Sequence, residues 1–176
     1  MKTKISEVTV QTILEFKCPR YSELPTIGLY KDQVISYIET ALKPLTANTT
    51  EKLLTPTMLN NYVKQKVVSP PKGRRYEQKH LAYLIVVCIL KQVYTISEVC
   101  ELIQIQINTC EIEEAYDYFC VELEKALVSV FKTRDFSEES SAKITTFESE
   151  LLRSTTLAFA HKLYVQDYLY QEKNKM

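Results

Sequence analysis

The 176-residue sequence contains two glycines, no tryptophan, and no Cys-x-x-Cys pair among its five cysteines. Few tight turns and β-bulges can be built from two glycines, so the composition favours a helical fold. An odd number of widely spaced cysteines argues against a disulfide framework and against a structural zinc site. Most of the cysteines lie in apolar helical runs and are therefore expected to be core thiols, which fits a reducing cytoplasm.

Long hydrophobic runs are also missing. The most apolar stretch, residues 81–90 (LAYLIVVCIL), has ten residues, which is too short to span a bilayer and suits a buried helix. The opening MKTKISEVTV lacks the apolar core of a signal peptide. The sequence thus predicts a cytoplasmic protein with no membrane partner.

Motifs of catalysis are equally scarce. We find no activated nucleophile, carboxylate pair, metal-ligand cluster or phosphate-binding loop, and His80 and His161 lack an evident acid–base partner. We therefore expect no enzyme, no catalytic residue, no metal site and no cofactor.

Charge is balanced in number but not in position. The 22 basic and 22 acidic residues cancel, yet residues 55–80 hold six basic residues and one acidic residue, a net charge of +5. Residues 95–125 hold eight acidic residues and one basic residue, a net charge of −7. Because a local basic patch, and not the net charge, decides whether a polyanion docks, residues 55–80 are the candidate functional segment.

A helix followed by a basic turn is predicted within this segment. Thr55 before Pro56 is an N-cap with proline at the first helical position, and it predicts a helix that ends near Gln65. Pro70 and Pro71 exclude a continuing helix, so residues 67–76 (VVSPPKGRRY) are expected to form a small β-hairpin around a glycine turn.

Other helices are expected along the rest of the chain. Three are expected at about residues 6–16, 29–42 and 77–93, and a capping box at Thr95 opens a fourth. A fifth runs from a cap at Asn108 to about residue 131. The last is opened by Ser137, with Glu138 and Glu139 in its first turn, and runs to about residue 172.

A helix, a basic hairpin and a second helix is the order found in a winged helix-turn-helix, whose recognition helix enters the DNA major groove. Asparagine and glutamine can pair with adenine, and lysine and arginine can neutralise phosphates. For Tyr76, packing of the hairpin onto the core is the alternative to a DNA contact. The candidate DNA-binding residues are Thr57, Asn60, Asn61, Lys64, Gln65, Lys72, Arg74, Arg75 and Tyr76.

A family resemblance points the same way. Residues 57–103 resemble the DNA-binding domain of the MerR family of bacterial regulators: Leu59 and Tyr62 match its recognition-helix core, Arg75 and Tyr76 the end of its wing, and residues 96–99 (ISEV) its last element. Lys66 stands where that family usually has glycine. With ELPTIGLYKDQV ahead of it, the chain is identified as a member of the MerR-like family numbered 1836 among the domains of unknown function.

The resemblance implies an all-α fold with a MerR-like winged helix-turn-helix, its small β-hairpin wing, and a C-terminal region forming a long helical hairpin. We expect residues 1–28 to form an N-terminal helix and connection, residues 29–107 the winged domain, and residues 108–176 a dimerisation or sensing region. The implied function is sequence-specific binding of duplex DNA by a homodimer that regulates transcription.

Two alternatives stay open. One is a protein-interaction adaptor that uses the winged fold without DNA. The other is a sensor with an unidentified small-molecule effector between its C-terminal helices. Apolar residues from Ile112 to Val130 follow a 4-3 spacing, and Ile144, Leu151, Ala158 and Val165 recur every seven residues. Such seams pack helix against helix, either within one chain or between two.

Overall fold

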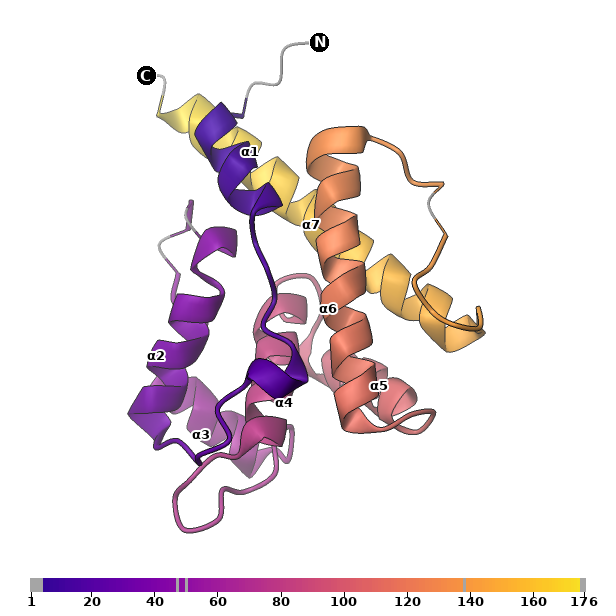
Figure 1. The fold of residues 1–176 in the computed structure, drawn as a ribbon. Helices are drawn as coiled ribbons and strands as arrows, with labels where there is room; N and C mark the ends of the chain where they lie inside the picture. Colours follow the sequence, from indigo (N-terminus) through magenta and orange to yellow (C-terminus); the bar gives the residue numbers. More distant parts are fainter. Residues whose placement is uncertain (1–4, 47, 50, 138, 175–176) are drawn as a thin grey trace. The chain divides into compact units, whose positions relative to one another are not determined.

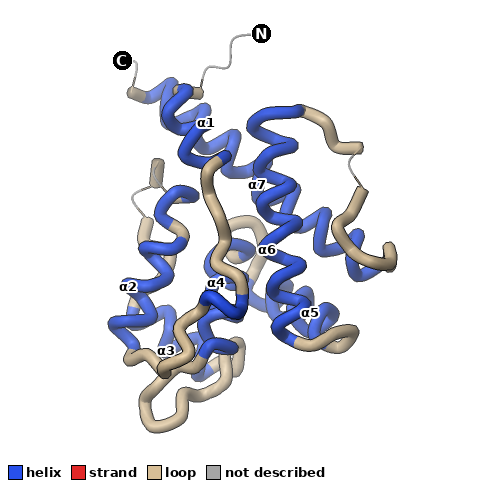
Figure 2. Tube along the Cα trace, viewed as in Figure 1, coloured by secondary structure: helices blue, strands red, loops and turns tan. Residues whose placement is uncertain are grey.

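The computed structural model describes residues 5–46, 48–49, 51–137 and 139–174. These residues form helices and loops, without a β-strand among them (Figures 1 and 2), so the expected all-α class is confirmed. Their α-helices are α1 (Glu7–Leu14), α2 (Lys31–Ala41), α3 (Pro56–Lys64), α4 (Gln78–Leu90), α5 (Ile96–Ile107), α6 (Ile112–Val128) and α7 (Phe147–Lys173). Short helical turns are η1 (Tyr21–Glu23), η2 (Lys43–Leu45) and the π-helical turn η3 (Ser129–Thr133).

The chain divides into two compact units, each assembled from separated stretches. The first unit comprises residues 1–18, 43–50 and 118–176, and the second unit comprises residues 19–42 and 51–117. The second unit therefore contains the predicted winged segment 29–107 apart from residues 43–50. It holds α2, α3, α4 and α5, and the basic segment lies wholly within it.

The second unit is organised around α4. Eight of the ten residues of the apolar stretch 81–90 are buried on this helix, which confirms the expectation of a buried helix. Helix α4 contacts α2 and α5, and α2 contacts α3. Burial of each large aliphatic side chain contributes about 1.5–3 kcal/mol, so α4 supplies much of the apolar stabilisation of this unit. Within the described ranges, no helix unites the length and the apolar character that crossing a bilayer requires.

The first unit packs α1 and α7 against η3. Phe119, Leu123 and Val130 are buried, so the 4-3 seam on this part of the chain is already covered within one copy of it. On α7 the buried face includes Leu152, Phe159 and Leu163, which are offset from the seven-residue repeat expected from the sequence. Of that repeat, Val165 is 54% exposed and Ile144 lies outside the helix.

The prediction of a β-hairpin wing at residues 67–76 is wrong. All ten residues of this segment are described, and the only backbone bridge between two of them joins Lys72 and Arg75. Tyr76 instead bridges to Leu29, far away in the sequence. The physical reason is that Pro70 and Pro71 have no N–H to donate to a ladder, so the arms of the turn cannot extend into strands.

Helix starts were predicted with mixed success. Thr55 and Thr95 cap α3 and α5 as expected: the Thr55 hydroxyl accepts the Met58 N–H (3.2 Å) and the Thr95 hydroxyl accepts the Glu98 N–H (3.3 Å). Asn108 does not open a helix, because it ends α5 and its N–H donates to the Gln104 carbonyl (3.1 Å).

The predicted start of the last helix at Ser137 is also wrong. The Ser137 N–H and hydroxyl both donate to the Asp135 carboxylate (2.9 and 2.6 Å), which holds the serine in a local turn. Helix α7 begins at Phe147, and its N-cap is Thr146, nine residues after Ser137; the Thr146 hydroxyl accepts the Ser149 N–H (3.2 Å). Glu138, expected in the first helical turn, lies outside the described residues.

Candidate nucleic-acid interface

Helix α3 separates a buried face from a polar one. Leu59 and Tyr62 are buried, and burial, followed by the Cys88 thiol, raises the pKa of Tyr62 to about 12. The proline at the first helical position and the Thr55 cap fix where the helix starts, and this sets which residues face outward. The exposed polar residues of α3 and its end are Thr57, Asn60, Asn61, Lys64 and Gln65.

The helix ends in a left-handed turn at Lys66. This lysine has φ 61°, and its N–H donates to the Val63 carbonyl (3.1 Å). The next N–H, of Val67, donates to the Tyr62 carbonyl (2.9 Å), which completes a Schellman motif. A lysine thus occupies a position that glycine usually fills, with its charged side chain exposed.

A four-residue turn, Lys72 to Arg75, carries the second group of basic side chains. Gly73 (φ 54°) and Arg74 (φ 65°) both have positive φ, and the Arg75 N–H donates to the Lys72 carbonyl (2.9 Å). Two successive positive φ values are the sign of the tight turn that joins hairpin strands. Lys72, Arg74 and Arg75 are exposed, so the turn presents positive charge although it is not part of a wing.

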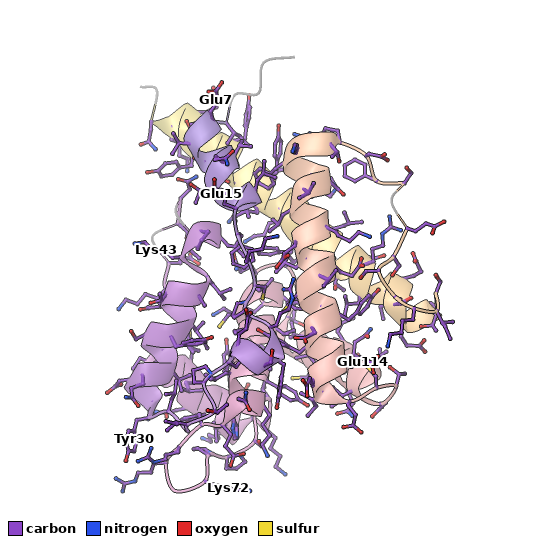
Figure 3. The ribbon with its side chains drawn as sticks, in the orientation of Figure 1. Glu7, Glu15, Tyr30, Lys43, Lys72 and Glu114 are labelled. Atoms are coloured by element: carbon purple, nitrogen blue, oxygen red, sulfur yellow. The ribbon has the colours of Figure 1, made fainter. Side chains whose placement is uncertain are left out.

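Arg75 is also a structural residue. Its guanidinium donates to the Gly28 carbonyl and to the Tyr30 hydroxyl, both at 3.1 Å. A Cβ on Gly28 would lie 2.9 Å from the Arg75 Cβ, so glycine permits this close approach. Figure 3 shows Tyr30 at the start of α2 and Lys72 on the loop after α3.

Tyr76 lies in the core, with 4% of its surface exposed. Its backbone exchanges two hydrogen bonds with Leu29 (2.9 and 2.8 Å), and its ring meets the His80 ring edge-on, with centroids 5.6 Å apart. Burial raises the pKa of Tyr76. We therefore leave Tyr76 out of the candidate interface, which keeps the other eight predicted residues.

His80, on α4, contacts Ser69 in the loop that precedes the turn from Lys72 to Arg75. Its Nδ1 accepts the Glu77 N–H (2.8 Å), so in the neutral ring the proton is on Nε2, which lies 3.1 Å from the Ser69 hydroxyl. Burial, followed by the charge of Lys79, lowers the pKa of His80. A neutral imidazole thus holds the loop that leads into the turn.

Sequence reasoning missed Gly28 and Tyr30 as the partners of Arg75. They lie 47 and 45 residues away along the chain, and no local pattern connects segments that distant. The remaining predicted basic residue of this region, Lys79, pairs with Glu77 (3.5 Å), which reduces its contribution to the patch.

A family model described as a domain of unknown function (DUF1836) matches residues 19–119, which is more than half of the chain. The chain belongs to the DUF1836 family. The match to DUF1836 includes the whole basic segment, and the predicted membership is confirmed. The match is to DUF1836 alone, and it does not show a likeness to MerR-type regulators. No curated protein and no solved structure gives a significant match to the chain.

Proposed function

We propose that this DUF1836 protein is a sequence-specific DNA-binding transcriptional regulator that acts in the cytoplasm. The observation that carries the proposal is the exposed polar face of α3, followed within one unit by the exposed turn from Lys72 to Arg75. Side-chain amides on a helix can address base edges, while flanking lysines and arginines address phosphates.

Charge sets the expected strength of the phosphate contacts. Lys64, Lys66, Lys72, Arg74 and Arg75 are exposed, and no acidic residue lies between positions 55 and 76. If these five side chains neutralise about five phosphates, the logarithm of the binding constant should fall with the logarithm of salt concentration at a slope of about −5 per subunit.

The first experiment is a salt titration of the purified full-length protein on duplex fragments selected from a genomic library. Lys72→Gln should reduce the slope by about one and weaken binding to all sequences alike. Lys132→Gln is the matched control, because Lys132 is also an exposed lysine but belongs to the first unit. Association that does not depend on salt, or no association at low salt, would end the DNA hypothesis and favour the adaptor.

The helix should supply specificity where the turn supplies affinity. Asn61 is exposed on α3 and can pair with adenine. Asn61→Ala should change the preferred base at one position of the selected site, by about 1–3 kcal/mol. An unchanged preference profile would mean that Asn61 is ordinary helix surface.

DNA binding as a homodimer is part of the proposal. One unit of this size offers few base contacts, and a pair of them on two half-sites would double the number. The apolar seam from Ile112 to Val130 is covered within the chain, so we place the homodimer contact on α7. There Val165 and Leu169 are 54% and 53% exposed and lie one turn apart.

The dimer is tested by light scattering at micromolar concentration. Val165→Glu combined with Leu169→Glu should convert a dimer into a folded monomer with weaker DNA binding. Gln166→Glu is the control, since Gln166 is exposed on the same helix and this change adds a negative charge, one where the double variant adds two, without removing an apolar side chain. A monomeric wild-type protein would rule out the homodimer.

A further inference from the structure

Two cysteines that lie far apart in the sequence meet in the first unit. Cys18, which follows α1, and Cys120, on α6, have their sulfur atoms 3.2 Å apart. Both side chains are buried, with 2% and 0% of their surface exposed. A disulfide has a sulfur–sulfur distance of about 2.05 Å, so bonding requires a movement of only about 1 Å.

Glu124 holds this arrangement together. It lies one turn after Cys120 on α6, and its carboxylate accepts the backbone N–H of Cys18 (3.0 Å). The same carboxylate pairs with the Lys17 ammonium group (3.2 Å). The backbone at Cys18 is therefore bonded to the helix that carries Cys120, which keeps the two sulfur atoms close together.

The position of the pair in the chain gives it a consequence. Cys18 and Cys120 are the residues directly outside the stretch 19–119 that matches the family model. The second unit lies wholly inside this stretch. A covalent bond between the two sulfurs would close a ring that contains the whole second unit, and would remove conformational freedom from the unfolded chain.

The other cysteines have different surroundings. Cys88 is buried on α4 and its thiol donates to the Leu53 carbonyl (3.7 Å), while the Cys110 thiol donates to the Gln106 carbonyl (3.6 Å). Burial raises the pKa of Cys88 to about 12. These contacts direct the two thiols to backbone oxygens, whereas the Cys120 thiol donates to the Cys18 sulfur.

We propose that Cys18 and Cys120 form a reversible disulfide when the protein meets a peroxide. One thiol sulfur attacks a peroxide oxygen, which breaks the O–O bond and gives a sulfenic acid and one water. The second sulfur then displaces the sulfenic oxygen as a second water, so two thiols are oxidised while one hydrogen peroxide is reduced. This inference does not depend on DNA binding.

The test uses the native full-length protein, treated with hydrogen peroxide, quenched, and then denatured for thiol counting and peptide mapping. The thiol count should fall from five to three, with one linked peptide pair containing residues 18 and 120, and dithiothreitol should restore all five. The thermal midpoint of the oxidised protein should rise by about 5–15 °C.

Variants locate the bond. Cys18→Ser and Cys120→Ser should each abolish the linked peptides, while Cys100→Ser should leave them unchanged. The wild-type peptide map decides even if a variant does not fold. Linkage of a different pair, oxidation of these sulfurs to sulfinic acids, or linkage only after denaturation would overturn the proposal, as would a midpoint that does not rise.

Discussion

The guanidinium of Arg75 lies over the ring of Tyr30, with Cζ 4.6 Å from the ring centroid, and donates a hydrogen bond to its hydroxyl group (3.1 Å). An arginine that sequence reasoning assigned to phosphate binding is therefore also a link between the turn and the start of α2. The two roles can be separated, because Arg74 stands beside it in the same turn.

Arg75→Ala should lower both stability and DNA affinity. Loss of the contact over Tyr30 and of the hydrogen bonds to Gly28 and Tyr30 should cost about 1 kcal/mol in the free energy of unfolding. Arg74→Ala removes the same charge from the neighbouring position, and should change stability by less than about 0.5 kcal/mol while weakening DNA binding similarly. Equal stability of the two variants in urea unfolding would show that the Arg75 contacts contribute little.

Gly28→Ala should be destabilising because of space. The new methyl group would lie 2.9 Å from the Arg75 Cβ, which is not a flexible end that can move aside. We expect a loss of about 1–3 kcal/mol. In an Arg75→Gly background this Cβ is absent, so the cost of Gly28→Ala should largely disappear there. A double-mutant cycle with no coupling between the two positions would contradict the close approach.

Lys66→Gly should stabilise the protein. Lys66 has φ 61°, which costs a side-chain-bearing residue about 1–2 kcal/mol, while glycine in its place loses about 0.5–1 kcal/mol of chain entropy. The expected net gain is about 0.5–1 kcal/mol in the free energy of unfolding. Lys66→Ala is the control, because it removes the same charge but keeps the strained backbone, and it should bring no gain.

Stability should fall on acidification through His80. The pKa of His80 is lowered in the folded state, so the unfolded state binds more protons. The contribution of neutral His80 to the free energy of unfolding is complete above the unfolded pKa of about 6.5, and it is lost as pH falls through the folded pKa. His80→Gln should reduce the loss of stability between about pH 7.5 and pH 5. His161→Gln, which changes an exposed histidine on α7, should retain the wild-type loss.

Local signals predicted local structure well. The caps at Thr55 and Thr95 and the apolar run of α4 were all readable, because each depends on residues a few positions apart. The start of α7 was misplaced because Ser137 and Thr146 are both plausible caps, and only the side-chain bonds to Asp135 distinguish them.

The candidate site could be predicted in part from the sequence, because some of its features also depend on residues a few positions apart. The exposed face of α3 follows from helical spacing, whereas the burial of Tyr76 follows from its pairing with Leu29. The pairing of Cys18 with Cys120 likewise joins residues 102 positions apart. Contacts of that separation leave no periodic trace in one sequence.

The interleaving of the two units bears on the order in which the protein folds during synthesis. The first unit takes residues from three stretches, and the last of these begins at residue 118. The ribosome, at about 5–20 residues per second, therefore delivers every residue of the second unit before most of the first unit exists. We expect residues 1–18 and 43–50 to wait, with apolar side chains such as Ile13 and Leu45 uncovered, until α7 has been translated. Nascent chains that end before α7 should therefore be the ones that chaperones retain.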